Sequence, residues 1–247
     1  MNPSVLYHSK NNIATIIINR PDRLNAINEE VELGLALAWR RFNESEDRVA
    51  VLTGAGDKAF SVGKDLSYLA APNYRKFTPG FDIQVSKPII AAINGWCIGG
   101  AIVLVQMCDL CVAGEGAKFT YPEAKLGFAG GAISSIASRM PHKIAMELML
   151  LGEEITAERA YQVGFVNKVV PKADVLDAAY QYADRLAKNA PMVLSMLKNF
   201  VGQMLPKGPM ELASLAMKEV DAVMESGDRE EGMQSYADKR QPVYKGK

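Results

Sequence analysis

Short apolar segments separated by turn-forming residues dominate the first two-thirds of the chain. β-Branched side chains are frequent in 13–19, and apolar residues fill 49–53 and 88–93, so each segment is predicted to be a buried strand. After Asn28, apolar residues recur at helical spacing at Val31, Leu35, Ala38 and Phe42. Strand, helix and strand in this order predict a βαβ crossover, and therefore a fold of the α/β class.

The stretch 87–131 combines the strongest apolar pattern with paired glycines. It is predicted to form a strand, a tight turn at Gly99-Gly100, a buried helix over 101–107, a second strand and a loop. A helix N-terminus presents unpaired N–H groups and a partial positive charge, and glycine lets a ligand approach them closely. The turn could therefore bind a developing oxyanion. The alternative is that the glycines serve packing alone.

The remaining segments suggest a core followed by helices. We expect a turn at 61–65 leading into a short helix capped by Asp65, and a mobile or irregular loop over 68–85. Helical patterns occupy 132–151, and Thr156 is expected to cap a helix that ends near Gly164, before a strand over 165–170. From residue 173 onward the pattern is helical, interrupted at Pro191, Pro206 and Pro209. This division predicts a core domain over 1–190 and a C-terminal helical region over 191–247.

Composition and charge exclude several classes of function. The 247 residues carry 28 basic and 28 acidic side chains, so the formal net charge is zero and a nucleic-acid partner is not expected. The apolar runs are too short to cross a membrane, and no signal-peptide pattern is evident, so we expect a cytoplasmic protein. Cys108 and Cys111 form a C-x-x-C pair, but with only two histidines in the chain we expect buried thiols and no metal site.

Several motifs, in order along nearly the whole chain, resemble those of the crotonase superfamily, the enoyl-CoA hydratase/isomerase family. They are Asn19-Arg20-Pro21, Leu24-Asn25-Ala26, Leu52-Thr53-Gly54, Ala59-Phe60-Ser61-Val62-Gly63-Lys64-Asp65-Leu66, Lys87-Pro88, Asn94-Gly95, Gly99-Gly100, Cys108-Asp109, Pro122-Glu123, Leu126-Gly127, Ala160, Gly164-Phe165-Val166, Arg229-Glu230, Gly232-Met233 and Lys239-Arg240. Their order and spacing make the resemblance specific.

The resemblance implies a fold, an assembly and a substrate. The fold would be a ββα spiral of two stacked sheets surrounded by helices, whose helical C-terminal region helps to build a homotrimer or a dimer of trimers. The substrate would be an acyl-CoA thioester, with no further cofactor. Its thioester oxygen would bind the backbone amides of Lys64 and Gly100, which would stabilise an enolate as its charge develops.

The resemblance also implies substrate-binding positions in this sequence. We expect the CoA phosphates near Arg23, and near Lys58 or a C-terminal lysine of a neighbouring subunit. The other positions expected to line the substrate site are Leu24, Ala26, Ser61, Val62, Gly63, Asp65, Leu66, Gly99 and Val103.

One departure from the family pattern bears on the reaction. The hydratases of the family hold water between two glutamates, and Val103 stands at the position of the first. Glu123 stands at the position of the second, where an apolar pocket would raise its pKa toward neutral. One carboxylate suffices for a 1,3-proton shift, which favours an isomerase-like reaction.

Other activities stay open at this point. Members with a single glutamate also catalyse thioester hydrolysis or retro-aldol cleavage, and a hydratase remains an alternative. Asn94-Gly95-Trp96-Cys97 resembles a run in the hydroxycinnamoyl-CoA hydratase-lyases, but Tyr68 is out of register with a tyrosine that they need. Ala129-Gly130 replaces a usual proline, which leaves the shape of the acyl pocket open. A non-catalytic, RNA-binding relative would need a basic face, against which the neutral charge argues.

Overall fold

A six-stranded sheet forms the centre of the molecule. The computed structural model describes residues 3–68, 70–128 and 130–247. The strand order is β1-β2-β3-β5-β7-β10, with β1 antiparallel to β2 and the other neighbours parallel. The bounds are β1 Val5–Lys10, β2 Ile13–Ile18, β3 Val49–Gly54, β5 Ile89–Ile93, β7 Leu110–Gly114 and β10 Lys168–Val170.

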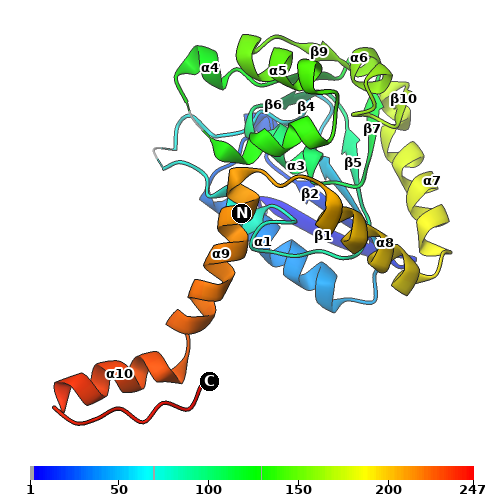
Figure 1. Ribbon diagram of the computed structural model, residues 1–247. Coiled ribbons are helices and arrows are strands. Elements are labelled where there is room, and N and C mark those ends of the chain that lie inside the picture. The colour runs from blue at the N-terminus through cyan, green and yellow to red at the C-terminus, as the bar shows by residue number, and fades with distance from the viewer. Residues whose placement is uncertain (1–2, 69, 129) are drawn as a thin grey trace.

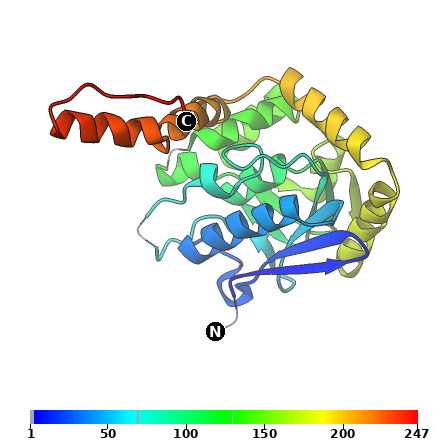
Figure 2. The ribbon, with the colours of Figure 1, turned by 90° about the horizontal axis from the view of Figure 1, so that it is seen from below.

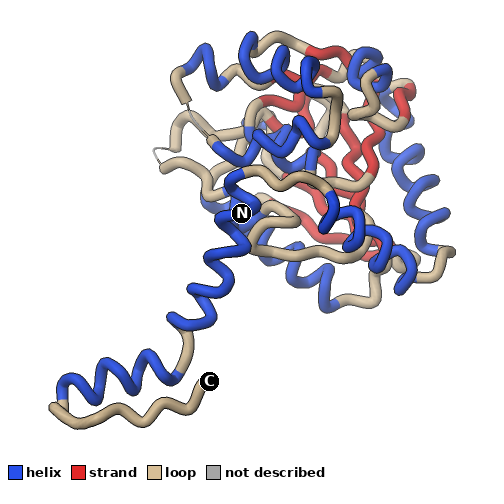
Figure 3. Tube along the Cα trace, in the orientation of Figure 1, coloured by secondary structure: helices blue, strands red, loops and turns tan. Residues whose placement is uncertain are grey.

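A smaller sheet of four strands packs beside the first. Its order is β4-β6-β8-β9, parallel except for the last pair. The strands are β4 (Ala59–Ser61), β6 (Trp96–Ile98), β8 (Lys118–Thr120) and β9 (Ile155–Thr156). In Figure 3 the strands lie inside the main body and helices surround them.

The chain passes repeatedly from the large sheet to the small sheet and then into a helix. The three passages are β3-β4-α2, β5-β6-α3 and β7-β8-α4. The helices are α2 (Tyr74–Phe77), α3 (Gly100–Gln106) and α4 (Glu123–Leu126). This repetition confirms the predicted ββα spiral of two stacked sheets.

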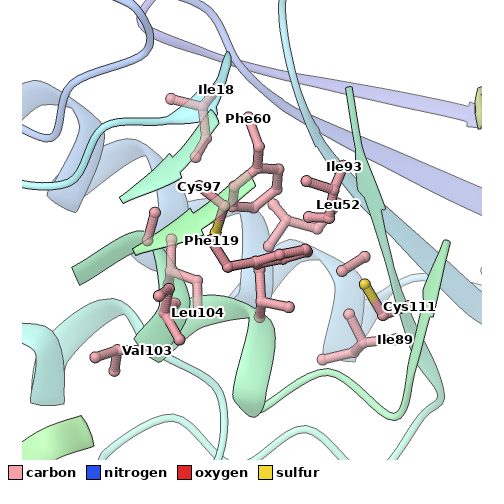
Figure 4. Packing of buried hydrophobic residues seen from close by; sticks show 14 of the residues in the cluster. Ile18, Leu52, Phe60, Ile89, Ile93, Cys97, Val103, Leu104, Cys111 and Phe119 are labelled. Carbon is pink, nitrogen blue, oxygen red and sulfur yellow. The ribbon is translucent and has the colours of Figure 1, made fainter. Parts of the chain in front are cut away.

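Two separate apolar layers cover the two faces of the large sheet. On one face, Val49, Val51 and Ile90 pack against α7 (Val175–Ala187). On the other face, alternate residues of the same strands meet α1 (Glu29–Glu44) and the small sheet. Figure 4 shows Phe60, Cys97 and Phe119 of the small sheet against Leu52 and Ile93 of the large one. The second layer is therefore the one that joins the two sheets.

Helix α1 forms as its sequence predicts. The Asn28 side chain accepts a hydrogen bond from the Val31 amide and caps the N-terminus. Its apolar stripe, which includes Trp39 and Phe42, is fully buried. Acidic residues in the first turn and Arg41 in the last complement the helix dipole.

Three helices form the C-terminal region, and the first of them stays on the main body through an ion pair between Lys198 and Asp109 at 2.8 Å. Their bounds are α8 Pro191–Met204, α9 Pro209–Met224 and α10 Gly227–Ala237. Figures 1 and 2 show α9 and α10 extending away from the two sheets. Helix α8 begins at Pro191, where the sequence places the end of the core. That residues 1–190 and 191–247 are separate units stays a prediction.

Several local predictions were wrong in detail. In the described residues 66–68, directly after Asp65, the chain forms a turn and not the predicted helix. The described residues of the segment 68–85 include α2 and bury Phe77 and Phe81 in the core, so this part is not only an irregular loop. The predicted strand 165–170 shortens to β10. The predicted helical run 132–151 divides into a 3₁₀ helix, Gly131–Ser138, and α5, His142–Leu151.

Thr156 caps α6 (Ala157–Gln162) as expected, by accepting a hydrogen bond from the amide of Arg159. In the described ranges, no helix has both the length and the apolar character that crossing a membrane would need.

Candidate active site

Two glycine turns meet at the edge of the small sheet. The Gly63 backbone has φ +74° and the Ser61 hydroxyl accepts a hydrogen bond from its amide, which fixes the first turn. The second turn is at Gly99, with φ +57°, directly before α3. A Cβ atom on Gly63 would lie 2.6 Å from the Ile98 carbonyl oxygen and 3.1 Å from the Gly100 nitrogen. The two turns can pack this closely only because side chains are missing.

The turns place the amides of Lys64 and Gly100 near each other. Gly100 is the first residue of α3, so its N–H has no partner within the helix. Within the described ranges, neither amide donates a hydrogen bond to another backbone group. Two free donors, of which that of Gly100 is at the N-terminus of α3, can stabilise negative charge on a bound oxygen. The assignment of these amides to an oxyanion hole stays a prediction.

Glu123 projects onto the second turn from the start of α4. Its Oε1 lies 2.6 Å from the position that a Cβ on Gly99 would occupy. Its Oε2 is buried and has no hydrogen-bond partner in the described structure. Burial raises the pKa of Glu123 to about 7, and only its own backbone amide opposes the shift. A carboxyl with this pKa can accept and return protons near neutral pH.

Val103 lies one turn into α3 from Gly100. Its side chain is 2% exposed and belongs to the larger buried apolar cluster. It offers no group that could hold water or move a proton. Glu123 is the carboxyl group that contacts this turn, and its role as the catalytic acid stays a prediction.

The segment 24–27 lies beside the first turn and forms one wall of the candidate active site. The amide of Ile27 donates to the Gly63 carbonyl oxygen at 2.7 Å, and the Asp65 amide donates to the Ile27 carbonyl oxygen at 2.9 Å. The Val62 amide donates to the carbonyl oxygen of Leu24 at 3.2 Å. The predicted binding residues Leu24, Ala26, Val62 and Gly63 therefore lie along one wall.

The carboxylate of Asp65 stabilises the local structure through hydrogen bonds and an ion pair. Its carboxylate accepts hydrogen bonds from the Ser67 hydroxyl at 2.6 Å and the Ser67 amide at 3.0 Å, and forms an ion pair with Arg20 at 2.8 Å. These bonds, those from Ser67 foremost, lower the pKa of Asp65 to about 2. Arg20 also donates to the Ala26 carbonyl oxygen at 2.7 Å. Asp65 thus ties the wall to the turn instead of capping a helix.

The residues predicted to meet CoA lie around the same wall. Arg23 ends a 3₁₀ helix, Pro21–Arg23, and is exposed, and the Leu66 side chain is 71% exposed. Leu24 and Lys58 line one pocket of about 490 Å³ that also contains Lys118 and Lys172. Glu123 does not line this pocket. Contact of these residues with a CoA phosphate stays a prediction.

Two tyrosines beside Glu123 were missed by the sequence analysis. Tyr74 begins α2 within the predicted loop, and its hydroxyl oxygen lies 1.6 Å from where a Cβ on Gly100 would be. Tyr121 precedes Glu123 by two residues and is buried. Burial, and secondly the Glu123 charge, raise the pKa of both tyrosines. The spacing of Tyr74, Phe77 and Phe81 is that of a helical apolar stripe, and this signal was available in the sequence.

Cysteine positions agree with a structural role. Cys111 is buried and Cys108 is half-buried, and burial raises the pKa of both thiols. Over the residues whose placement is described, no three His, Cys, Asp or Glu side chains gather as a metal site would require. Ala129, which was expected to influence the acyl pocket, lies outside the described residues.

The two stacked sheets and the ββα spiral define the class of protein as one with the crotonase fold. Three solved structures share it over the whole chain. They are "Structure of a carnitinyl-CoA dehydratase from Mycobacterium avium 104" (TM-score 0.76, 35% identity, covering 99% of this chain and 100% of that chain), a probable enoyl-CoA hydratase/isomerase from Mycobacterium abscessus (0.76, 37%, 100% of both) and an enoyl-CoA hydratase from Mycobacterium tuberculosis H37Rv (0.77, 33%, 100% of both).

The family follows from the sequence comparison. The profile of the enoyl-CoA hydratase/isomerase family matches residues 8–247. The carnitinyl-CoA dehydratase of Salmonella paratyphi A is 35% identical over 253 aligned positions, which cover 95% of each protein. The chain belongs to the enoyl-CoA hydratase/isomerase family.

Proposed function

We propose that this protein transforms an acyl-CoA thioester by moving a proton at the carbon next to the thioester. Glu123 is the acid/base, and the amides of Lys64 and Gly100 bind the thioester oxygen. The observation that carries the proposal is the buried Oε2 of Glu123, which has no partner in the described structure although it lies beside the glycine turn. Buried polar atoms in proteins normally have partners, so an unpaired carboxylate oxygen suggests a place for substrate.

The single acid favours a proton shift. Glu123 can remove a proton from one carbon and return it to another, which moves the double bond of an enoyl-CoA. Val103 is apolar and buried, so no second carboxylate stands on α3 to activate water. This double-bond shift is an isomerase-like reaction, and it is the first candidate for the reaction.

Addition or removal of water is the second candidate. Relatives from Salmonella and Mycobacterium avium are named carnitinyl-CoA dehydratase. Dehydration also begins with the removal of a proton from the carbon next to the thioester. In the dehydration direction the substrate would carry a hydroxyl group on the β-carbon, and in the hydration direction it would be a 2-enoyl-CoA. Glu123 would have the same role in both candidates, which differ in whether water is gained or lost. An experiment that measures both deuterium uptake and the change in mass can therefore separate them.

The test is a panel of saturated, 2-enoyl, 3-enoyl and 3-hydroxyacyl-CoA thioesters in D₂O, followed by mass spectrometry. Deuterium uptake without a change in composition indicates proton transfer, and gain or loss of one water indicates hydration or dehydration. The Glu153→Gln variant is the matched control, because Glu153 is an exposed carboxylate at the start of another loop. If no thioester exchanges deuterium or reacts, the proposal is wrong.

A designed second acid tests the placement of α3. Val103→Glu should raise hydration of a 2-enoyl-CoA and lower the melting temperature, because an acid replaces a side chain that is 2% exposed. Val105→Glu, another nearly buried position of the same helix, should lower stability without any gain of hydration. Equal hydration by both variants would contradict the proposed geometry.

We also propose that the C-terminal helices assemble the protein into a trimer or a dimer of trimers. Helix α8 exposes large apolar side chains, among them Met192 at 84% and Phe200 at 56%. Such a surface is typical of an interaction site. Light scattering at micromolar concentration should give a mass of three or six chains, and a stable monomer would contradict the proposal.

A further inference from the structure

Tyr74 reaches the candidate active site from an element that has no other part in it. Its hydroxyl oxygen contacts the Gly100 backbone, since a Cβ atom built there would be only 1.6 Å away. Gly99, the preceding residue, is contacted in the same way by Oε1 of Glu123. Consecutive Cα atoms are about 3.8 Å apart. The phenol and the carboxyl group therefore cover neighbouring positions of one turn.

The backbone around Tyr74 is firmly held. The indole N–H of Trp39 donates to the Phe77 carbonyl oxygen at 3.1 Å, and the rings of Tyr74 and Phe77 lie 5.0 Å apart. Arg75 donates to the Ser214 hydroxyl of α9 at 3.2 Å and to Asp82 at 3.0 Å. Contacts from α1 and α9 thus orient α2, so the Tyr74 hydroxyl has a defined position.

We propose that the Tyr74 hydroxyl binds an oxygen atom on the β-carbon of the acyl group, either the hydroxyl of a 3-hydroxyacyl-CoA or the water that adds to a 2-enoyl-CoA. This inference rests on the proposed function and extends it to a substrate class. Tyr74 would supply the polar contact that Val103 cannot make. Burial raises the pKa of Tyr74, so the phenol stays neutral and can donate a hydrogen bond.

The step balances without ionising Tyr74. In dehydration, Glu123 takes the proton from the α-carbon and the C–H electron pair forms the enolate. The enolate then forms the double bond between the α- and β-carbons as the β C–O bond breaks. The departing oxygen, held by Tyr74, takes the proton back from Glu123 and leaves as water. Hydration is the reverse sequence.

Tyr121 is the alternative phenol and provides a matched control. It also lies close enough to Glu123 for the carboxylate charge to raise its pKa. Its hydroxyl lies 3.6 Å from the Cβ position of Gly130, whereas the Tyr74 hydroxyl lies 1.6 Å from that of Gly100.

The experiment compares two activities in Tyr74→Phe and Tyr121→Phe. Interconversion of 3-hydroxybutyryl-CoA and crotonyl-CoA requires the β-oxygen, whereas α-deuterium exchange of butyryl-CoA in D₂O does not. Loss of one hydrogen bond to the reacting oxygen should slow interconversion about 10- to 100-fold in Tyr74→Phe. Deuterium exchange should stay within about threefold of wild type. Butyryl-CoA has no β-oxygen, so a group that contacts only this atom adds no transition-state binding. Tyr121→Phe should keep the wild-type ratio of the two activities.

Each contrary result identifies what failed. If Tyr74→Phe lowers both activities equally or changes neither, or if Tyr121→Phe alone changes the ratio, the assignment of Tyr74 is wrong and the proposed function stands. If the wild-type protein exchanges deuterium but never interconverts the pair, the substrate class is wrong. If it does neither, the proposed function is overturned and the inference with it. Phe keeps the ring packed on Phe77, and melting temperatures of all variants check that the fold is intact.

Discussion

Asp65 follows the first glycine turn in the chain and Glu123 contacts the second, but the two carboxylates have opposite surroundings. Asp65 is surrounded by donors from Ser67 and Arg20, which lower its pKa to about 2. Glu123 is buried with one oxygen unpaired, and its pKa rises to about 7. A carboxylate whose lone pairs are occupied by fixed donors cannot readily accept a proton. The comparison therefore supports the proposal that Asp65 holds the local structure and that Glu123 is the acid/base.

The largest effect should come from removing the basicity of Glu123. Glu123→Gln keeps the size of the side chain, and turnover should fall by about two to four orders of magnitude, the usual contribution of a general acid or base. Deuterium exchange and product formation by mass spectrometry measure the loss. Glu153→Gln should match the wild type, and an active Glu123→Gln enzyme would remove the distinction between the two carboxylates.

A side chain at Gly100 should have the next largest effect. In Gly100→Val the new atoms would meet the Tyr74 hydroxyl and the space over the amide, and a displacement of about 1 Å can slow a reaction about a hundredfold. Steady-state turnover and circular dichroism separate a damaged site from a damaged fold. Gly202→Val, on α8 where a Cβ meets nothing within 4 Å, is the control. Wild-type turnover in a folded Gly100→Val protein would argue against the oxyanion assignment.

The pH profile should report Glu123 and not Asp65. Proton removal needs the ionised carboxylate, so exchange should rise about tenfold between pH 6 and pH 8 for a group whose pKa is about 7. The rise should disappear in Glu123→Gln and persist in Asp65→Asn. A profile that is flat over this range in the wild type would contradict the raised pKa.

The smallest effect on turnover should come from Asp65→Asn. The change weakens the contacts with Arg20 and Ser67, and the unfolding free energy should fall by about 1–3 kcal/mol, whereas turnover should stay within about threefold. Because the folded-state pKa of Asp65 is lowered from 3.8 to about 2, its stabilisation is present above pH 3.8 and is lost as the pH falls through 2. Denaturant unfolding should therefore show a difference between the two proteins at pH 6 that shrinks below pH 4. A difference that does not depend on pH would contradict this account.

The elements predicted correctly are those whose sequence signal is local. Helix α1 carries its own cap at Asn28 and its own apolar stripe, and β2, β3 and β5 are marked by β-branched or apolar runs. The glycines of both turns could be recognised because close backbone approach excludes a side chain. Through the family motifs, the sequence also predicts Glu123 as the acid and Val103 in place of a second one, and both roles stay predictions.

The elements that were missed depend on partners far away in the chain. Strands β4, β6 and β8 have three residues each, and pairing with one another defines them more than their own sequence does. Helix α2 was taken for a loop because its order comes from Trp39 and Ser214, which are distant in sequence. The position of Tyr74 beside Gly100 could therefore not be predicted from the sequence.

The sequence by itself determined the family and the two glycine turns, because spacing and residue type express these directly, whereas a single catalytic acid stays a prediction. Only the tertiary structure decided what each charged group does. Asp65 meets Arg20 from a segment 45 residues away, whereas Glu123 enters a region where the described residues supply no donor to its Oε2. A pKa depends on the solvent and the donors around the carboxylate, and these are set by packing between distant segments.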